Sequence, residues 1–221
     1  LMLRLATQLE PDTLALNQAF TNESFLLENG LTKETALTLF IPNSYEFYWN
    51  VSAKKIADKM AKEHMKFWNA ERLAKAKVLN MTPAQVYTLA SIVHKETVKA
   101  DERPRVAGAY LNRIQQDMPL QADPTVIYAI KEKLGDFDQV IKRVGGSNLF
   151  VKSPYNTYIN KGLPPGPIAM PDISAIDAVL NAEKHNFIYF CADPNRPGYH
   201  SFETTYEAHM INAKKYAAWV N

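Results

Sequence analysis

Several classes of protein are excluded by what this sequence of 221 residues lacks. It contains one cysteine, Cys191, so an intrachain disulfide and a zinc site built from several cysteines are both excluded. It contains no run of about 18 apolar residues and no signal-peptide pattern, so no membrane-spanning segment is predicted within it. The net charge is only +2 and the lysines and arginines form no dense run, which argues against a nucleic-acid-binding surface.

The sequence is equally poor in the familiar catalytic motifs. His94-Lys95-Glu96 has the H-x-E spacing of zinc deaminases, but the P-C-x-x-C that such enzymes need is absent. No serine lies in a G-x-S-x-G elbow, although residue counts alone do not exclude a Ser/His/Asp triad. The glycines at 145 and 146 precede no expected helix, so no phosphate-binding loop is predicted. We therefore expect neither a metal nor a cofactor. Because Cys191 lies in the apolar run FIYFC, we interpret it as a buried structural thiol.

The residues that are present predict a globular, mostly helical protein. Hydrophobic residues make up 47% of the chain and charged residues 22%, which is enough apolar surface for a sizeable core. Helical periodicity dominates, and the clearest strands are FIYFC and a partner near His200. The predicted fold class is α+β, mostly helical with a few short antiparallel strands.

Helix boundaries follow from caps and prolines. We expect Ser52 to cap one long helix that runs to Val78, and Asp101 to cap a helix with an inward face of Val106, Ala107, Tyr110, Leu111 and Ile114. A short helix is predicted over 136–144. A capping box of Thr204 and Glu207 is predicted to open a C-terminal helix.

The best-defined helix is predicted over Met81–Thr97. Thr82 fits the N-cap and Pro83 the first helical position. Its apolar face comprises Val86, Leu89, Ala90 and Val93, and Glu96 continues that face. The carboxylate of Glu96 is then either frayed into solvent or held in a partly apolar wall. In the second case burial raises its pKa and makes it a candidate general acid.

A loop of about 27 residues over 145–171 is predicted to be ordered and functional. Near it in the sequence, or within it, lie amides, hydroxyls and aromatic side chains that together resemble a carbohydrate-binding cleft. These candidates are Gln121, Asp123, Tyr128, Tyr155, Asn156, Thr157, Tyr158, His200 and Phe202. Each also has a purely structural interpretation: Asp123 as a helix cap, Asn156 as a turn residue, Tyr128 and Tyr158 as half-buried core.

Four motifs, in order, resemble the YceG-like family of endolytic murein transglycosylases. They are ASIVHKET, PLQADPTVIYAI, SPYNTYINKGLPPGPIAMP and HSF, and they cover roughly residues 89–202. Upstream, LRLATQL and FIPNSYEF are similar to earlier segments of the family. The family's helix motif usually reads E-K-E-T with the second glutamate catalytic. Here His94 stands at the first position, and we expect it to be a surface residue.

The resemblance implies an enzyme that cleaves the β-1,4 bond between N-acetylmuramic acid and N-acetylglucosamine inside peptidoglycan strands, with Glu96 as the single acid and base. The substrate's N-acetyl group would be the internal stabiliser of the transition state, and Gln121, Tyr155 and Asn156 are the candidates for holding it. A muramidase-type hydrolase and a non-catalytic glycan-binding module are the alternatives.

The resemblance also implies a cellular setting. Family members have one N-terminal transmembrane anchor and a LysM-like module, so this chain would be the extracytoplasmic part of a protein of the cytoplasmic membrane, facing the periplasm or the cell exterior. Residues 1–51 would be a helical subdomain left after the missing anchor and module, and residues 52–221 the catalytic domain. A peptidoglycan synthase (penicillin-binding protein) is the implied partner.

Overall fold

The computed structural model describes residues 1–141 and 144–220. Two compact units make up the chain, Leu1–Ala84 and Gln85–Asn221. In the part of the chain that is described, no helix combines the length and the apolar character needed to cross a membrane.

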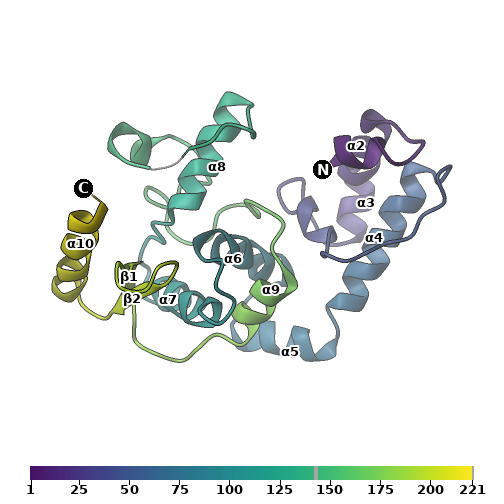
Figure 1. Cartoon of the computed structure of the whole chain (residues 1–221). Coiled ribbons are helices and arrows are strands. Elements are labelled where there is room, and N and C mark those ends of the chain that lie inside the picture. Colours follow the sequence, from purple (N-terminus) through teal and green to yellow (C-terminus); the bar gives the residue numbers. More distant parts are fainter. Residues whose placement is uncertain (142–143, 221) are drawn as a thin grey trace. The chain divides into compact units, whose positions relative to one another are not determined.

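The first unit is a set of helices around a small apolar core (Figure 1). Its elements are α1 (Met2–Ala6), α2 (Thr13–Thr21), α3 (Glu23–Glu28), the 3-10 turn η1 (Ala36–Leu39), α4 (Ala53–Phe67) and α5 (Ala70–Val78). Helix α2 packs against α1, α3 and α4. Side-chain caps define the helix starts: Asp12 accepts a hydrogen bond from the Ala15 amide at 2.7 Å, and Asn22 accepts one from the Phe25 amide at 2.9 Å.

The single long helix predicted from Ser52 to Val78 is wrong, because the structure breaks it into α4 and α5. Ser52 caps α4 as expected, but α4 ends at Phe67. Asn69 then accepts a hydrogen bond from the Arg72 amide at 3.0 Å and starts α5. Asparagine competes for backbone donors in this way and so favours caps over helix interiors. Because α4 packs on α2, the compact unit extends beyond the subdomain predicted over 1–51, whose assignment as a domain stays a prediction.

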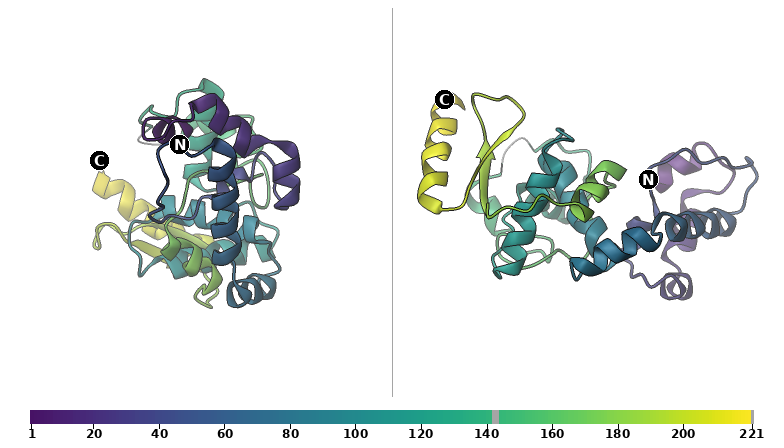
Figure 2. Two further views of the ribbon diagram at one scale, coloured as in Figure 1. Left: turned by 90° about the vertical axis from the view of Figure 1, so that its right-hand side faces the viewer. Right: turned by 90° about the horizontal axis from the view of Figure 1, so that it is seen from below.

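The second unit surrounds α6 (Pro83–Glu96), in which every residue from Val86 to Val93 is buried. Around it lie α7 (Arg103–Gln115), α8 (Asp123–Leu134), the 3-10 turn η2 (Gly146–Phe150), α9 (Ile173–Leu180), β1 (Tyr189–Ala192), β2 (His200–Glu203) and α10 (Tyr206–Val220). The strands are antiparallel, with Phe190 opposite Phe202, and α10 packs on both of them (Figure 2). The mostly helical α+β fold predicted from the sequence is confirmed.

Several local predictions need correction because side chains bind different partners. Asp101 does not cap α7: its carboxylate accepts a hydrogen bond from the Tyr199 hydroxyl at 3.0 Å, and Glu102 holds the N-cap position. Thr205, and not Thr204, accepts the amide of Ala208 at 3.2 Å at the start of α10.

Two further predictions fail on secondary structure and burial. No helix forms over 136–141, and residues 142–143 lie outside the described residues. Strand β1 and the thiol of Cys191 are half-buried instead of buried. Burial and the nearby carboxylate of Asp193 still raise the pKa of this thiol, which disfavours its thiolate form.

Candidate active site

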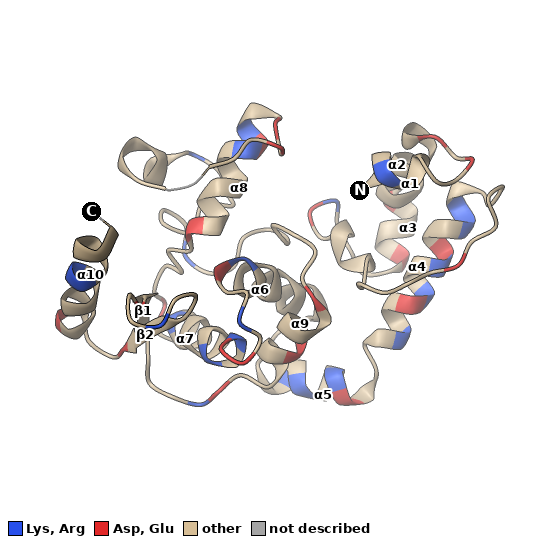
Figure 3. Cartoon of the chain, viewed as in Figure 1, with Lys and Arg blue, Asp and Glu red and all other residues tan. Residues whose placement is uncertain are grey.

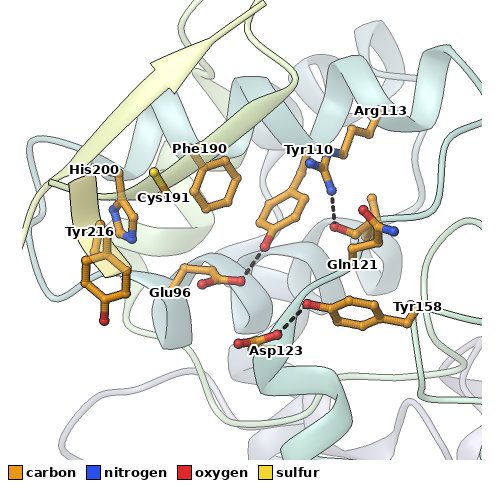
Figure 4. A pocket seen from close by; sticks show the side chains of 12 residues that line it. Glu96, Tyr110, Arg113, Gln121, Asp123, Tyr158, Phe190, Cys191, His200 and Tyr216 are labelled. Carbon is orange, nitrogen blue, oxygen red and sulfur yellow. Dashed lines mark hydrogen bonds between the residues drawn. The ribbon is translucent and has the colours of Figure 1, made fainter. Parts of the chain in front are cut away.

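A cavity of about 300 Å³ opens in the second unit beside the end of α6 (Figure 4). Side chains from α6, α7, α8, both strands, α10 and the loop that follows η2 converge on it. The lining residues are Glu96, Tyr110, Arg113, Leu120, Gln121, Asp123, Tyr158, Phe190, Cys191, Ala192, His200 and Tyr216. Five of the residues proposed from the sequence, Glu96, Gln121, Asp123, Tyr158 and His200, therefore share one cavity.

Glu96 is the last residue of α6, and its side chain is held by the protein instead of being frayed into solvent. The hydroxyl of Tyr110 donates a short hydrogen bond to Glu96 Oε1, which fixes the carboxyl group (Figure 4). Burial raises the pKa of Glu96 to about 7, although the Tyr110 hydrogen bond and His200 act in the opposite direction. At neutral pH this group is divided between its acid and its carboxylate form, as a group that must both give and take a proton requires.

Tyr110 and Arg113 are site residues that the sequence interpretation missed. They lie three positions apart on α7, and the periodicity of that helix placed Tyr110 in the core without indicating a polar partner. The buried Arg113 guanidinium donates to the carbonyl oxygens of Leu120 at 2.7 Å and Ile188 at 2.5 Å, so it joins the segment before α8 to the segment before β1. Burial, and then the Glu96 charge, raise the pKa of the Tyr110 hydroxyl well above its usual value, so it stays a donor.

Gln121, Asp123 and Tyr158 line the cavity from the start of α8 and from the loop that follows η2. Gln121 has a left-handed backbone conformation, with φ of 49°, which is uncommon for a residue with a side chain. Its amide nitrogen donates to the Thr157 carbonyl at 3.0 Å, and its side chain is exposed at the cavity. Tyr158 donates its hydroxyl to Asp123 Oδ1 at 2.5 Å. The interpretation of Asp123 as a helix cap is therefore wrong: Ala122 holds the N-cap position of α8, and the carboxylate of Asp123 binds the tyrosine.

His200 enters the cavity from β2 and is oriented by Glu102. The Glu102 carboxylate accepts the His200 amide at 2.6 Å and lies 2.9 Å from its Nδ1. Burial would raise the pKa of Glu102, but these His200 contacts outweigh it and hold that pKa below its usual value. Because Glu102 remains a carboxylate, His200 donates its Nδ1 proton to it, which fixes the orientation of the ring.

Two of the predicted site residues, Asn156 and Thr157, are fully buried behind the cavity. The Asn156 side chain donates to the carbonyls of Leu149 and Val151, at 3.0 and 2.9 Å, and accepts the Tyr158 amide at 2.9 Å. Thr157 Oγ1 accepts the Ala122 amide at 3.0 Å. Their positions give them the role of holding Tyr158 and the start of α8 in place. Direct contact with a ligand is not available to them in this structure.

Three more predicted residues lie outside the cavity lining. The rings of Tyr128 and Tyr155 pack 4.6 Å apart, and Tyr128 lines a different cavity. Phe202 packs beside Phe190, its cross-strand neighbour, with ring centroids 5.5 Å apart, so it contacts a lining residue.

His94, expected at the surface, is partly buried. Its Nδ1 lies 3.4 Å from Asp172 Oδ2, and the same carboxylate oxygen receives hydrogen bonds from the buried Arg103 at 3.2 Å. Burial lowers the pKa of His94. This cluster ties the end of α6 to the start of α9 and lies outside the cavity lining. Among the described residues, no group of three or more His, Cys, Asp or Glu side chains is arranged to hold a metal ion.

Comparison with known proteins gives consistent matches. The sequence model of the YceG-like family matches residues 3–215. Proteins named endolytic murein transglycosylase are 40% identical over 114 residues in Streptococcus pneumoniae (strain D39) and 38% identical over 138 residues in Bacillus subtilis (strain 168). These matches cover 52% and 62% of this chain but 20% and 36% of those relatives, so the chain corresponds to a minor part of their length.

A solved structure is also similar. The crystal structure of a YceG-like protein from Listeria monocytogenes superimposes with a TM-score of 0.78 at 29% identity, covering 95% of this chain and 71% of that one.

Proposed function

Because this chain belongs to the YceG-like family, we propose that it is an endolytic peptidoglycan lytic transglycosylase, and that Glu96 is its catalytic acid and base. The relatives' name supports the reaction class. The observation that carries the proposal is the position of Glu96, in a cavity with amide, hydroxyl and aromatic side chains and with a pKa raised to about 7.

Glu96 acts twice in the proposed reaction. In its acid form it donates a proton to the glycosidic oxygen as the bond from that oxygen to C1 of the N-acetylmuramic acid breaks. The resulting carboxylate then accepts the proton of the C6 hydroxyl of the same sugar while O6 attacks C1. The products are a 1,6-anhydro sugar end and a new N-acetylglucosamine end. No water is consumed, and Glu96 returns to its acid form.

The surroundings of Glu96 suit both steps. The Tyr110 hydroxyl binds Oε1 and leaves the second carboxyl oxygen to face the substrate. Positive charge develops at C1, and the substrate's own N-acetyl oxygen is the proposed stabiliser, held by the exposed amide of Gln121. Tyr155 and Asn156, also considered for this role, lie away from the cavity lining, so Gln121 is the remaining candidate.

Asp123 gives a specific reason to keep a muramidase-type hydrolase as the second candidate. Most glycosidases use two carboxyl groups, and Asp123 is a second one in the same cavity. In the hydrolase a water oxygen would end on C1 of the muramic acid. A non-catalytic glycan-binding module is less well supported, because Glu96 is held beside Tyr158 instead of being solvated and remote from the tyrosine loop.

The cellular setting remains part of the proposal. The substrate lies outside the cytoplasmic membrane, so the cavity would face the periplasm or the cell exterior. We propose that an N-terminal membrane anchor keeps it there and that a peptidoglycan synthase of the penicillin-binding class works beside it. Co-purification of the membrane-bound protein with such a synthase would support this arrangement.

The direct test replaces Glu96 with Gln, which keeps the shape and removes the acid. Incubation with purified sacculi followed by mass spectrometry of the released muropeptides should show anhydromuropeptide formation reduced about 1000-fold. The matched control is Glu132→Gln, which changes an exposed carboxylate on α8 in the same way and should retain activity. Activity of Glu96→Gln close to that of the unchanged protein would refute the assignment of Glu96 as the catalytic acid and base.

A further inference from the structure

A second cavity, of about 320 Å³, lies in the same unit and is lined by the neighbours of two active-site residues. Lys95 directly precedes Glu96, and Pro124 directly follows Asp123. The lining residues are Lys95, Pro124, Ile127, Tyr128, Lys131, Phe137, Ile168 and Ala169, and we call this cavity the lysine subsite. Nothing in the proposed reaction at Glu96 uses it.

Helix α8 provides one continuous wall from the active site to the lysine subsite. Pro124, Ile127, Tyr128 and Lys131 follow the i, i+3, i+4, i+7 spacing of a single helix face. Asp123 begins this helix in the active site, and Lys131 lies about 12 Å further along the axis. In Figure 3 the acidic start and the basic far turn of α8 lie at opposite ends of the helix. A strand bound at Asp123 can therefore extend along α8 toward Lys131.

The charge of the lysine subsite has one sign. Its lining contains two lysines and no carboxylate. The carboxylate of Glu132, between Lys131 and Lys133, is exposed and outside the lining, but its charge acts on the Tyr128 hydroxyl. Lys131 Nζ donates to the Phe137 carbonyl at 3.0 Å, which holds the ammonium group in position. Lys95 is exposed and forms no ion pair or hydrogen bond through its side chain among the described residues.

The lysine subsite also offers aromatic faces. Tyr128 and Phe137 have ring centroids 5.7 Å apart, and Tyr155 packs behind Tyr128. Flat apolar faces beside two ammonium groups match a ligand that combines a sugar ring with a carboxylate. In peptidoglycan this combination occurs on muramic acid and is absent from N-acetylglucosamine.

We propose that the lysine subsite binds the carboxylate-bearing substituent of a muramic acid unit that flanks the cleaved bond. This inference rests on the proposed function and adds a specificity determinant to it. The carboxylate has two sources, the lactyl group itself or the peptide stem attached to it. Lys95 and Lys131 bind the carboxylate, and Tyr128 and Phe137 contact the adjacent sugar or stem.

The test measures kcat and KM for Lys95→Ala, Lys131→Ala and the double variant, with Lys214→Ala on α10 as the exposed-lysine control. The substrates are soluble glycan strands with intact stems and strands stripped of stems, which carry free lactyl carboxylates. Each single variant should raise KM about two- to fivefold and the double variant about tenfold, with kcat unchanged. The increase should shrink in high salt because the contact is ionic. An increase in KM for stripped strands identifies the lactyl group as the source of the bound carboxylate. An increase confined to stem-bearing strands identifies the peptide stem as its source.

Binding to the Glu96→Gln protein separates failure of this inference from failure of the proposed function. Neutral chitin oligosaccharides should bind equally to Glu96→Gln with and without the two lysine substitutions, whereas anionic strands should bind about tenfold more weakly to the triple variant. Equal binding of anionic strands to both proteins overturns the lysine subsite and leaves the function standing. Failure of Glu96→Gln to bind any strand overturns both.

Discussion

The two units of this chain differ in what they bury. Among the described residues, the first unit buries two polar side chains, Thr38 and His64. The rest of its core is apolar and includes Leu16, Phe20 and Leu39. The second unit buries nine: Thr88, Ser91, Thr97, Glu102, Arg103, Arg113, Thr125, Asn156 and Thr157. Every residue of the candidate active site belongs to the second unit.

The difference shows what the buried polar groups do. A buried polar group destabilises a fold unless it is hydrogen-bonded, so each one in the second unit needs a partner. Some of those partners are distant in sequence: Arg113 binds the carbonyl of Ile188, and Glu102 holds His200. In the first unit, His64 Nε2 has no partner among the described residues, and burial lowers the pKa of this histidine to about 4, so it is neutral at physiological pH. Buried polar groups therefore orient side chains of the candidate active site, such as His200, in the second unit, and the first unit contributes no residue to that cavity's lining.

The largest predicted effect compares one buried residue from each unit. Asn156→Leu keeps the number of side-chain heavy atoms but removes three hydrogen bonds, and it should lower the free energy of unfolding of the second unit by about 3 kcal/mol. Because Asn156 holds Tyr158, kcat/KM should also fall about 10- to 100-fold at temperatures where the protein stays folded. Urea denaturation and muropeptide release measure the two effects.

The matched variant is Leu16→Ala, which creates a cavity in the first unit. It should cost about 3 to 4 kcal/mol of stability and leave kcat/KM of the folded protein unchanged. Equal losses of activity in both variants would contradict the division of roles between the units.

A smaller effect concerns the stability cost of Glu96 itself. Burial raises its pKa from 4.5 to about 7 in the folded state, so folding favours the acid form and opposes the carboxylate. Burial of Glu96 therefore leaves the free energy of unfolding almost unchanged below pH 4.5. It lowers that free energy increasingly as the pH rises to 7, and by a constant amount at higher pH. Glu96→Gln should stabilise the protein by about 3 kcal/mol at pH 8 and by little at pH 4.5. Urea denaturation of the unchanged protein and of Glu96→Gln at the two pH values measures this effect. A stability difference between the two proteins that does not depend on pH would contradict a buried carboxylate.

The smallest effect isolates the Tyr110 hydroxyl. Its hydrogen bond lowers the pKa of Glu96 relative to burial alone, so Tyr110→Phe should raise that pKa. The alkaline limb of the pH profile of kcat/KM should then move to higher pH, with kcat reduced less than about tenfold. The phenyl ring can keep its edge contact with Phe190, which preserves the packing. If the alkaline limb of the Tyr110→Phe protein is unchanged, a group other than Glu96 sets that limb.

Parts of this site could be predicted from sequence because they depend on local patterns. The first-turn proline, Pro83, and the apolar face of α6 placed Glu96 at the end of a buried helix. The motifs placed Gln121, Asp123, Tyr158 and His200 together without a structure. The antiparallel pairing of the two strands followed from the apolar run FIYFC and the segment after the turn.

The rest depended on contacts between distant segments. Periodicity assigns Tyr110 to the core, but nothing local indicates that its hydroxyl meets Glu96, 14 positions earlier. Asn156 and Thr157 look like ligand-binding polar residues in sequence, and only their tertiary partners show that they support the loop instead. The break at Asn69 was missed because its flanks keep the same helical periodicity, and a single capping side chain decided the outcome.

The central claim is that Glu96 acts alone, as acid and then as base, so that no water enters the product. Digestion of sacculi in water enriched in the heavy oxygen isotope, followed by mass spectrometry of the new muramic ends, tests this claim most directly. We predict 1,6-anhydro ends that carry no heavy oxygen. Reducing muramic ends that contain one heavy oxygen would contradict it and would assign Asp123 or a bound water to a hydrolytic reaction.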